Sequence, residues 1–293
     1  MNLWAYSRRL LGTNGLLGLT AALVVAATAA PGVAHAGRVL LTGHDPDFHA
    51  QSQQSGKDQL NIFLNYATSG TYNGGLKKFL WVESNLSPGS GHLVGEAGLT
   101  SIGLALGTNF DAVDAAGLAA LPNFNSYSAI VVASSFGGML TSAEINELIA
   151  RSADIAGFVN AGGGLAALSE CAPTSGFCIG DNITAGTNLF GFVPVSVSSV
   201  GTTSPYTVTP FGAGLGLTDA MVSDCCTHNS FGTIGGLTVV DADATGVATT
   251  LAGDVTIGGG GFHSVPEPAT LGLLGLLGLG LAGVGFARRK RKH

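Results

Sequence analysis

The sequence predicts an α/β fold built on a mostly parallel β-sheet, and three observations support this prediction. Short apolar segments alternate with segments whose apolar residues recur at helical spacing. The connections between these segments are short, as in doubly wound sheets. Residues 127–133 are apolar almost throughout, which is typical of a strand covered on both faces.

The first part of the folded region alternates strand and helix. Its predicted elements are, in order, a strand at 38–42, a helix at 58–67 and a strand at 78–82. The stretch 84–125 is Gly-rich and ambiguous. Within it we expect a strand at 100–106 and a helix at 111–121, before the apolar strand at 127–133.

A capping box marks the start of the clearest helix. Thr141 is followed three residues later by Glu144, and apolar residues then recur at helical spacing as far as Val159. Glycines at 162–164 end this helix, and the next strand is 165–169. The later half is rich in Thr, Ser, Val and Gly, so we expect it to form the far edge of the sheet and hairpins. Its predicted strands are 193–199, 205–209, 237–241 and 247–252.

The N-terminus has the organisation of a secretory signal peptide, residues 1–36. Two arginines precede an apolar core at 16–30, and small residues on either side of His35 form a cleavage site. We therefore expect processing by signal peptidase, with the mature chain starting at Gly37.

The C-terminus carries an uncharged apolar stretch, residues 269–287. Its 19 residues correspond to about 28 Å of helix, close to the thickness of a bilayer core. The basic residues 288–293 follow it, and such clusters stay on the cytoplasmic side. We expect a transmembrane helix at 269–287, preceded by a flexible Gly-rich linker at 258–265.

The segment between the two hydrophobic ends, 37–265, is 229 residues long, enough for one sizeable domain. It contains five basic and 17 acidic residues, which gives it a net charge of −12. A charge of this sign argues against nucleic acid or anionic lipid as a partner.

All four cysteines lie in this segment, and an even number in an exported chain favours disulfides. Four cysteines allow three pairings. A bond between the adjacent residues Cys225 and Cys226 would be strained, so we expect bridges from them to the earlier pair. A zinc site is the alternative, although the spacings fit no standard ligand pair. The predicted disulfide residues are Cys171, Cys178, Cys225 and Cys226.

Polar residues follow several predicted strands, where ligands bind in open α/β sheets. After the first strand come His44, Asp45, Asp47 and His49; after the middle strand, Ser134 and Ser135; after the fourth, Ser169, Glu170 and Cys171. His228 is a further candidate by position. We expect these groups to converge at one edge of the sheet, with Ser169, Glu170 and His228 as catalytic candidates.

Metal binding is one chemistry that this set permits. His44 and His49 are the candidate ligands of a divalent metal, and Glu170 or His228 would complete the shell. The alternative is that Asp45-Pro46-Asp47 is only a turn. The later pair Asp241 and Asp243 is also predicted to form a surface turn, because it lacks the glycine and distal glutamate of a calcium loop. No other cofactor is expected.

The tail resembles a known sorting signal. Pro-Glu-Pro, a short apolar span and an Arg-rich end occur in the order of the PEP-CTERM domain of Gram-negative bacteria that produce exopolysaccharide. The resemblance implies recognition by an exosortase, brief residence in the inner membrane and release to the cell surface or extracellular matrix. An ordinary single-span anchor is the alternative. The residues of the predicted signal are Pro266, Glu267, Pro268, Arg288 and Arg289.

A second resemblance concerns the folded domain. The segments 39–49, 127–132 and 158–165 are similar to three segments of the ThuA-like (trehalose-utilisation-like) branch of the class I glutamine amidotransferase-like family. This resemblance implies a flavodoxin-like three-layer sandwich over residues 37–257.

The amidotransferase chemistry itself is not expected. That family needs a cysteine on a G-x-C-x-G elbow, and residues 167–172 lack the flanking glycines. A later His-x-Glu pair is also missing. The sequence thus favours an exported, non-catalytic or degenerate domain that binds polysaccharide or other matrix components. The alternative is a surface hydrolase or carbohydrate-modifying enzyme with a His/Asp/Glu site.

Overall fold

The computed structural model describes the folded region in detail. The described residues are 35–70, 72, 75, 77–84, 94–135, 140–169, 183, 187–199, 204–223, 227 and 229–265. The chain divides into two compact units, 1–34 and 35–293, and every described residue belongs to the second. The predicted signal core, the four cysteines and the tail from residue 266, with its predicted transmembrane helix, lie outside the described residues. Among the residues that are described, no helix is both long and apolar enough to cross a membrane.

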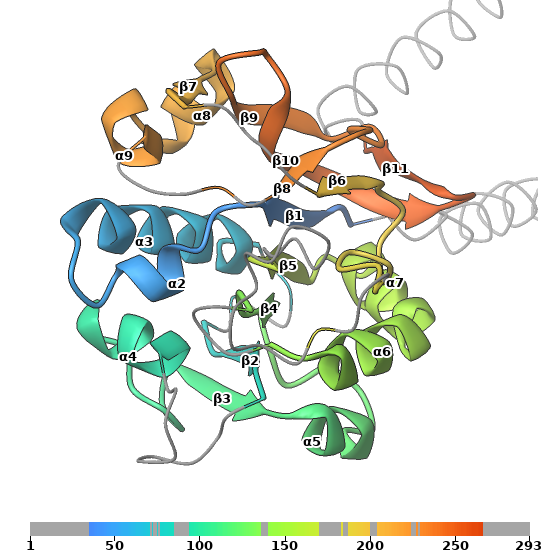
Figure 1. The fold of residues 1–293 in the computed structure, drawn as a ribbon. Coiled ribbons are helices and arrows are strands. Elements are labelled where there is room, and N and C mark those ends of the chain that lie inside the picture. Colours follow the sequence, from blue (N-terminus) through green and yellow to red (C-terminus); the bar gives the residue numbers. More distant parts are fainter. Residues whose placement is uncertain are drawn as a thin grey trace, which may run out of the picture. The chain divides into compact units, whose positions relative to one another are not determined.

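Strands and helices alternate through the first part of the domain (Figure 1). Its elements are β1 (Gly37–Thr42), α2 (Pro46–His49), α3 (Gln54–Thr68), β2 (Phe79–Val82), α4 (Val94–Ser101), β3 (Phe110–Val113), α5 (Ala115–Ala120), β4 (Ala129–Val132), α6 (Ser142–Ala150), α7 (Ser152–Asn160) and β5 (Gly164–Ala167). The later elements are β6 (Val197–Ser199), β7 (Thr207–Val208), α8 (Pro210–Leu215), α9 (Asp219–Ser223), β8 (Asn229–Phe231), β9 (Thr238–Ala242), β10 (Ala248–Gly258) and β11 (Gly261–Ser264). The α/β class predicted from the sequence is confirmed.

One large sheet runs through the domain in the order β3-β2-β4-β5-β1-β10-β9-β7, and β11 pairs with β10. The five strands β1 to β5 are parallel to one another. From β1 onward in this order, each strand is antiparallel to its next neighbour, and β11 is antiparallel to β10. The later strands β7, β9 and β10 therefore form the far edge of the sheet, as expected, and the parallel strands make up only one half of it. Strands β6 and β8 pair with each other in a separate two-stranded antiparallel sheet.

The strand order differs from the flavodoxin-like order 2-1-3-4-5. The first crossover carries the chain from β1 past β5 and β4 to β2, so β1 lies at the junction with the antiparallel half. The later crossovers return through β3 to β4 and β5. This arrangement retains helices on both faces of the sheet but places the first strand differently.

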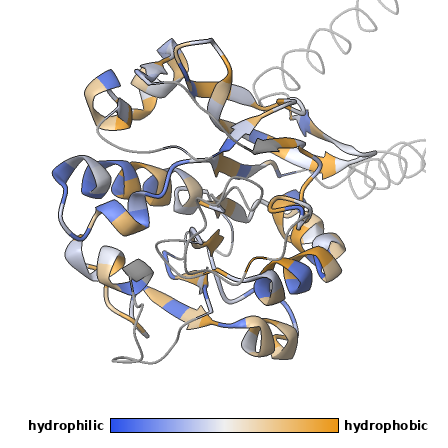
Figure 2. Ribbon diagram, viewed as in Figure 1, coloured by the Kyte–Doolittle hydropathy of each residue, from blue (hydrophilic) through white to orange (hydrophobic). Residues whose placement is uncertain are grey.

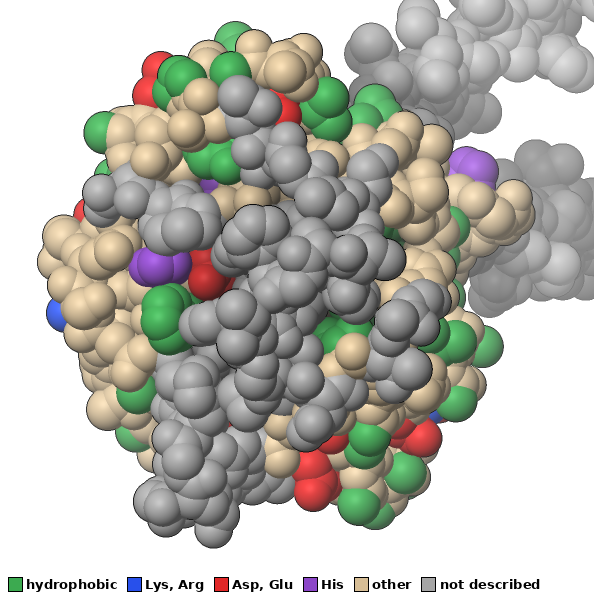
Figure 3. All heavy atoms as spheres, in the orientation of Figure 1, with side chains coloured by type: hydrophobic (Ala, Val, Ile, Leu, Met, Phe, Trp, Pro, Cys, Tyr) green, Lys and Arg blue, Asp and Glu red, His purple; other side chains and the backbone are tan. Residues whose placement is uncertain are grey.

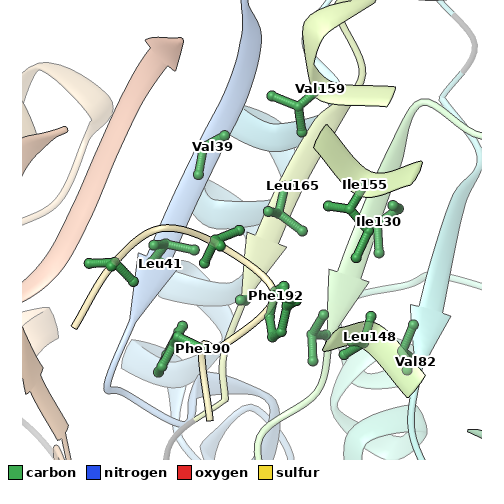
Figure 4. Packing of buried hydrophobic residues seen from close by; sticks show 14 of the residues in the cluster. Val39, Leu41, Val82, Ile130, Leu148, Ile155, Val159, Leu165, Phe190 and Phe192 are labelled. Carbon is green, nitrogen blue, oxygen red and sulfur yellow. The ribbon is translucent and has the colours of Figure 1, made fainter. Parts of the chain in front are cut away.

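Two hydrophobic clusters cover the two faces of the sheet. Val39 and Leu41 of β1 belong to one cluster and Leu40 to the other, because successive strand residues point to opposite faces. Helices α5, α6 and α7 pack on the first face, and α3, α4 and α9 on the second. Figure 4 shows side chains of α6 and α7 directed at the strands, and Figure 2 shows that the helices carry both apolar and polar residues. Both faces are covered, so β2, β4 and β5 are buried throughout.

The ambiguous Gly-rich stretch was the least predictable part. The expected strand at 100–106 is wrong: α4 ends at Ser101, and Gly103 follows with a positive φ of 85°. The expected helix at 111–121 is only partly correct, because its first residues form β3. Asp114 marks the true helix start, since its side chain accepts a 2.7 Å hydrogen bond from the Gly117 amide.

The capping box is present, but the helix that it starts is shorter than predicted. Thr141 accepts from the Ala143 amide, and its own amide donates to Glu144. The helix then breaks at Arg151 and restarts as α7. The Arg151 guanidinium donates to the Leu118 carbonyl at 2.6 Å and pairs with Asp154 at 3.1 Å. Arg151 thereby ties the break between α6 and α7 to the end of α5.

The predicted linker is largely part of the sheet. Gly258 ends β10, Gly261 begins β11, and the two glycines between them have positive φ values of 56° and 78°. Glycine adopts such positive φ values without steric strain. The Gly-rich composition that predicted a flexible linker therefore forms the tight turn of a β-hairpin. The folded region extends through Ser264.

We expect Gly164→Ala to destabilise the protein and Gly157→Ala to leave it as stable or make it more so. A Cβ at Gly164 would lie 2.0 Å from the Ala67 carbonyl oxygen, whereas a Cβ at Gly157 meets nothing within 4 Å. Overpacking of the kind expected at Gly164 costs about 1–3 kcal/mol. Alanine at a helical position such as 157 lowers the conformational entropy of the unfolded chain, which stabilises the fold by about 0.4–1 kcal/mol. Urea unfolding of both variants checks this, and a shift in the same direction for both would contradict the packing described for β5 and α3.

Candidate functional site

The candidate site lies at the carboxyl ends of the parallel strands. The chain leaves β1 into α2, leaves β2 at Glu83, leaves β4 at Ser134 and leaves β5 towards Ser169. Parallel strands end at one edge of a sheet, so these positions share that edge. All of these departure points are buried.

The predicted cluster His44, Asp45, Asp47 and His49 divides into three separate networks. His44 pairs with Asp241 of β9, Asp45 pairs with His49, and Asp47 reaches the end of β4. The two histidines thus face different carboxylates. The residues are close in sequence, but their side chains contact different parts of the domain.

His44 joins the end of β1 to the antiparallel half of the sheet. Its Nε2 lies 3.2 Å from Asp241 Oδ1, and its Nδ1 lies 2.5 Å from the Thr227 hydroxyl. Asp241 also accepts from Thr249. Because a carboxylate only accepts, Nε2 donates to Asp241, and the Thr227 hydroxyl is the partner of Nδ1. Leaving a buried polar group unpaired typically costs about 1–3 kcal/mol, so this network stabilises the junction between the two halves of the sheet.

Asp47 connects α2 to the end of β4. It is fully buried, and its Oδ2 accepts a 2.9 Å hydrogen bond from the Ser134 amide. Burial raises the pKa of Asp47 to about 7, although the hydrogen bonds from Ser134 oppose this rise. Helix α4 crosses close by, because a Cβ at Gly98 would lie 2.2 Å from the Asp47 carbonyl oxygen.

Glu83 is the most unusual group at this edge. It is fully buried, and neither of its carboxylate oxygens has a hydrogen-bond partner in the described structure. Burial raises the pKa of Glu83 to about 8, and the carboxylates Glu96 and Asp47 add to this rise. The nearby Trp81 indole N–H opposes the rise, although it makes no hydrogen bond of good geometry to Glu83 in the described structure. Burial also raises the pKa of Glu96, which lies in the first turn of α4. The three carboxyl groups Asp47, Glu83 and Glu96 form what we call the carboxylate cluster.

Ser169 is the fourth group at the edge. It is fully buried at the exit of β5, and its hydroxyl has no partner in the part of the chain that the structure describes. The other predicted site residues, Glu170, Cys171 and His228, lie outside the described residues. Within the described ranges, no group of three or more His, Cys, Asp or Glu side chains is arranged to hold a metal ion.

Sequence reasoning missed Glu83, Glu96 and Asp241. Glu83 follows a predicted buried strand directly, and the rule that placed His44 and Ser134 at strand ends applies equally to it. Asp241 was expected in a surface turn, but it is fully buried against His44. Asp243 does form a turn, in which its side chain accepts from the amides of Thr245 and Val247.

Comparison with known families identifies the end of the chain. Residues 264–292 match the PEP-CTERM protein-sorting motif. The motif marks proteins that are processed by an exosortase and exported to the envelope or surface of Gram-negative bacteria. No curated protein and no solved structure gives a significant match to the chain.

We expect the stability of the protein to fall as the pH rises from about 4.5 to 8, in large part because of Glu83. The pKa of Glu83 is about 8 in the folded protein and has its ordinary value of 4.5 in the unfolded chain. Both states bind the proton below pH 4.5, whereas above it the unfolded chain ionises first and is favoured. The effect approaches a magnitude on the order of 3–5 kcal/mol at pH 8.

Urea unfolding between pH 5 and 8 measures this effect. Glu83→Gln cannot ionise, so its free energy of unfolding should decline less with pH than that of the wild type. Glu147→Gln on α6 is the control and should follow the wild-type profile. Parallel pH profiles for the wild type and Glu83→Gln would show that Glu83 is not buried as described.

Proposed function

We propose that this exosortase-sorted surface protein is a hydrolase that cleaves glycosidic bonds of matrix polysaccharide by acid–base chemistry at the carboxylate cluster. The single observation that supports this most strongly is Glu83, a fully buried carboxyl group whose oxygens have no hydrogen-bond partner in the described structure. Leaving polar groups buried and unpaired costs stability, and strongly perturbed carboxyl groups concentrate at functional sites.

The elevated pKa gives Glu83 its role in this proposal. A carboxyl group with a pKa of about 8 holds its proton at neutral pH and acts as a general acid. As the bond from the sugar carbon to the leaving oxygen breaks, Glu83 donates its proton to that oxygen. Glu96 accepts a proton from the attacking water, whose oxygen forms the new bond to the carbon. Proton return from Glu96 to Glu83 through solvent restores the starting state.

The other residues at the edge position this pair. Asp47 is held by the Ser134 amide, and its second oxygen Oδ1 is buried without a hydrogen-bond partner in the described chain. Its charge opposes ionisation of Glu83 and so helps to keep Glu83 protonated. Ser169 supplies an unused hydroxyl at the neighbouring strand end. These groups leave hydrogen-bonding capacity that a sugar's hydroxyl groups would satisfy.

We expect Glu83→Gln to lower turnover by at least 100-fold, because a general acid typically contributes 10²–10⁴ in rate. The assay is release of reducing ends from soluble neutral glucans such as dextran, laminarin and cello-oligosaccharides. Glu147→Gln should retain wild-type turnover. Absence of turnover by the wild type, or equal turnover by Glu83→Gln, would refute the proposal.

Non-catalytic binding is the second candidate function, and a separate cavity favours it. The cavity has a volume of about 270 Å³ and is lined by Tyr72, Pro122, Asn123, Phe124, Asn125, Ala153, Asp154, Gly157, Phe158 and Ala161. Several of these residues directly precede β4 or β5 in the chain. The cavity is therefore near the amino ends of the parallel strands, at the edge of the sheet opposite to the carboxylate cluster. Aromatic walls with a few amide groups are typical of sites for small neutral ligands, including sugars.

The walls of this cavity are held in place. The Tyr72 hydroxyl donates to Asn125 Oδ1 at 2.9 Å, and its ring packs edge-on against Phe158 at 4.9 Å between centroids. Asp154 is neutralised by Arg151. The cavity therefore offers aromatic surface and neutral polar groups, which suits an uncharged saccharide better than an ion.

We expect Gly157→Leu to weaken binding of a neutral polysaccharide at least tenfold, because the added side chain enters the open space beside α7. Gly157→Ala adds one methyl group and is the matched control. Affinity electrophoresis in gels that contain dextran measures the binding, with acidic alginate as a second polymer. Equal retardation of Gly157→Leu and the control would exclude this cavity. Because Glu83→Gln leaves the cavity intact, loss of catalysis and loss of binding are separable.

Two finer assignments complete the proposal. The mature domain is a degenerate relative of the ThuA-like, amidotransferase-like family, and the parallel strands with helices on both faces support this relation. The cysteines form disulfides between the 171/178 and 225/226 segments, in keeping with an exported chain. After removal of the tail, the domain resides at the cell surface or in the matrix.

A further inference from the structure

A second and much smaller cavity lies between α2 and the start of α3. Its volume is about 10 Å³, so it has room for a single occupant of the size of a water molecule or an ion. In the space-filling view, a histidine and an acidic side chain lie side by side over α2 and α3 (Figure 3). The lining residues are His44, Asp45, Pro46, His49, Gln53, Ser55, Gly56 and Gln59.

Three oxygen atoms of the lining residues make no hydrogen bond of good geometry among the described residues, although one of them belongs to the pair of Asp45 with His49. They are Asp45 Oδ1, Gln53 Oε1 and Gln59 Oε1, and all three are buried. His49 Nε2 lies 3.3 Å from the first of them. Three buried acceptors around one small space leave a demand for positive charge or for hydrogen-bond donors.

The local fold explains why these oxygens remain unused. Asp45 and Gln53 occupy the N-cap positions of α2 and α3, but within the described stretch 35–70 neither side chain makes a capping hydrogen bond. Aspartate is among the preferred N-cap residues, yet the Asp45 carboxylate does not cap α2. The Gln59 amide nitrogen donates to the Met221 carbonyl at 2.6 Å, which leaves its oxygen free on the other side of the amide.

The cavity is also rigid. A Cβ at Gly56 would lie 2.6 Å from the His49 carbonyl carbon, so α2 and α3 are packed too closely for a larger residue there. The backbone segments that carry the ligands are therefore held close together before any occupant arrives. Such preorganisation favours binding of one small ion over a flexible or larger ligand.

From this geometry we infer a binding site for one divalent cation, with Asp45, His49, Gln53 and Gln59 as its ligands. A single water molecule has only two protons to donate, whereas a cation interacts with every oxygen in its shell. One imidazole with carboxylate and amide oxygens matches the ligand preference of Mn²⁺ more closely than that of Ca²⁺, which takes oxygen ligands. His44, the other histidine in the lining, has its imidazole engaged by Asp241 and Thr227.

This site is independent of the proposed hydrolysis. Its ligands come from α2 and α3, whereas Glu83 and Glu96 come from the end of β2 and from α4. Bound Mn²⁺ would link α2 to α3 and stabilise the loop that leaves β1.

Electron paramagnetic resonance of Mn²⁺ tests the inference. Untagged protein, freed of metal with EDTA, is titrated with MnCl₂, and loss of the signal of free Mn²⁺ reports binding. We expect one ion per chain, together with a concentration-dependent rise in the thermal midpoint. Asp45→Asn and Gln53→Leu should each weaken binding at least tenfold. Gln54→Leu is the matched control, because Gln54 bonds to Asp58 at the exposed surface and should leave the affinity unchanged.

Asp45→Asn could weaken the fold by itself, so Gln53→Leu serves as a second variant. Gln53 makes no side-chain capping bond within the stretch 35–70, so its replacement should leave the fold intact. Circular dichroism confirms that each variant is folded before its affinity is compared. Failure to bind Mn²⁺, or equal binding by the wild type, Asp45→Asn and Gln53→Leu, would overturn the inference and leave a water molecule as the occupant.

Discussion

The pairing of β1 on both of its sides is the constraint on which the rest of the domain depends. Its residues pair in parallel with β5 and antiparallel with β10, so this one strand joins the two halves of the sheet. At its end, His44 pairs with Asp241 of β9 and forms an isolated bridge with Thr227. Gly43 permits this closure, because a Cβ there would lie 2.2 Å from the Asn229 carbonyl oxygen. The positions of α2 and of every side chain on it follow from this junction.

The edge of the parallel strands gathers carboxyl groups in a setting that opposes their ionisation. Asp47 and Glu83 are both fully buried, and oxygens of both lack hydrogen-bond partners in the described structure. A core that had only to be stable would satisfy or remove such groups. Asp241 is equally buried, and its Oδ1 has a histidine and a hydroxyl as partners, whereas neither oxygen of Glu83 has one among the described residues.

The sequence predicted the periodic elements well and the local exceptions poorly. The apolar strands β1, β2, β4 and β5 and the capping box of α6 follow from patterns that span several residues. The order of the strands and the break at Arg151 depend on contacts between distant segments, such as Arg151 with the Leu118 carbonyl. No local pattern encodes these contacts.

The candidate site shows the same division between local and distant information. Polar residues that directly follow predicted strands, such as His44 and Ser134, are buried at one edge of the sheet. Glu83 also follows a predicted strand, so the same criterion would have included it. The partners of His44, however, come from residues almost 200 positions away, and turn propensity suggested the surface for Asp241. Side-chain direction within α2 was equally hidden, because neighbours in sequence join different networks.

The hairpin of β10 and β11 has a mechanical consequence for an exported protein. The sorting motif begins at Ser264, the last residue of β11, and that residue pairs with Val255 of β10. Tension on the tail therefore acts directly on this pair and then on the next, opening the short strand one rung at a time. In the sheet β11 pairs with β10, and Phe262 of β11 is also buried in the core and donates its amide to the Gly235 carbonyl at 3.0 Å, so the opening is resisted at Phe262. The sorting motif thus begins inside the fold, and β11 transmits a pull on the tail to the sheet and to the hydrophobic core.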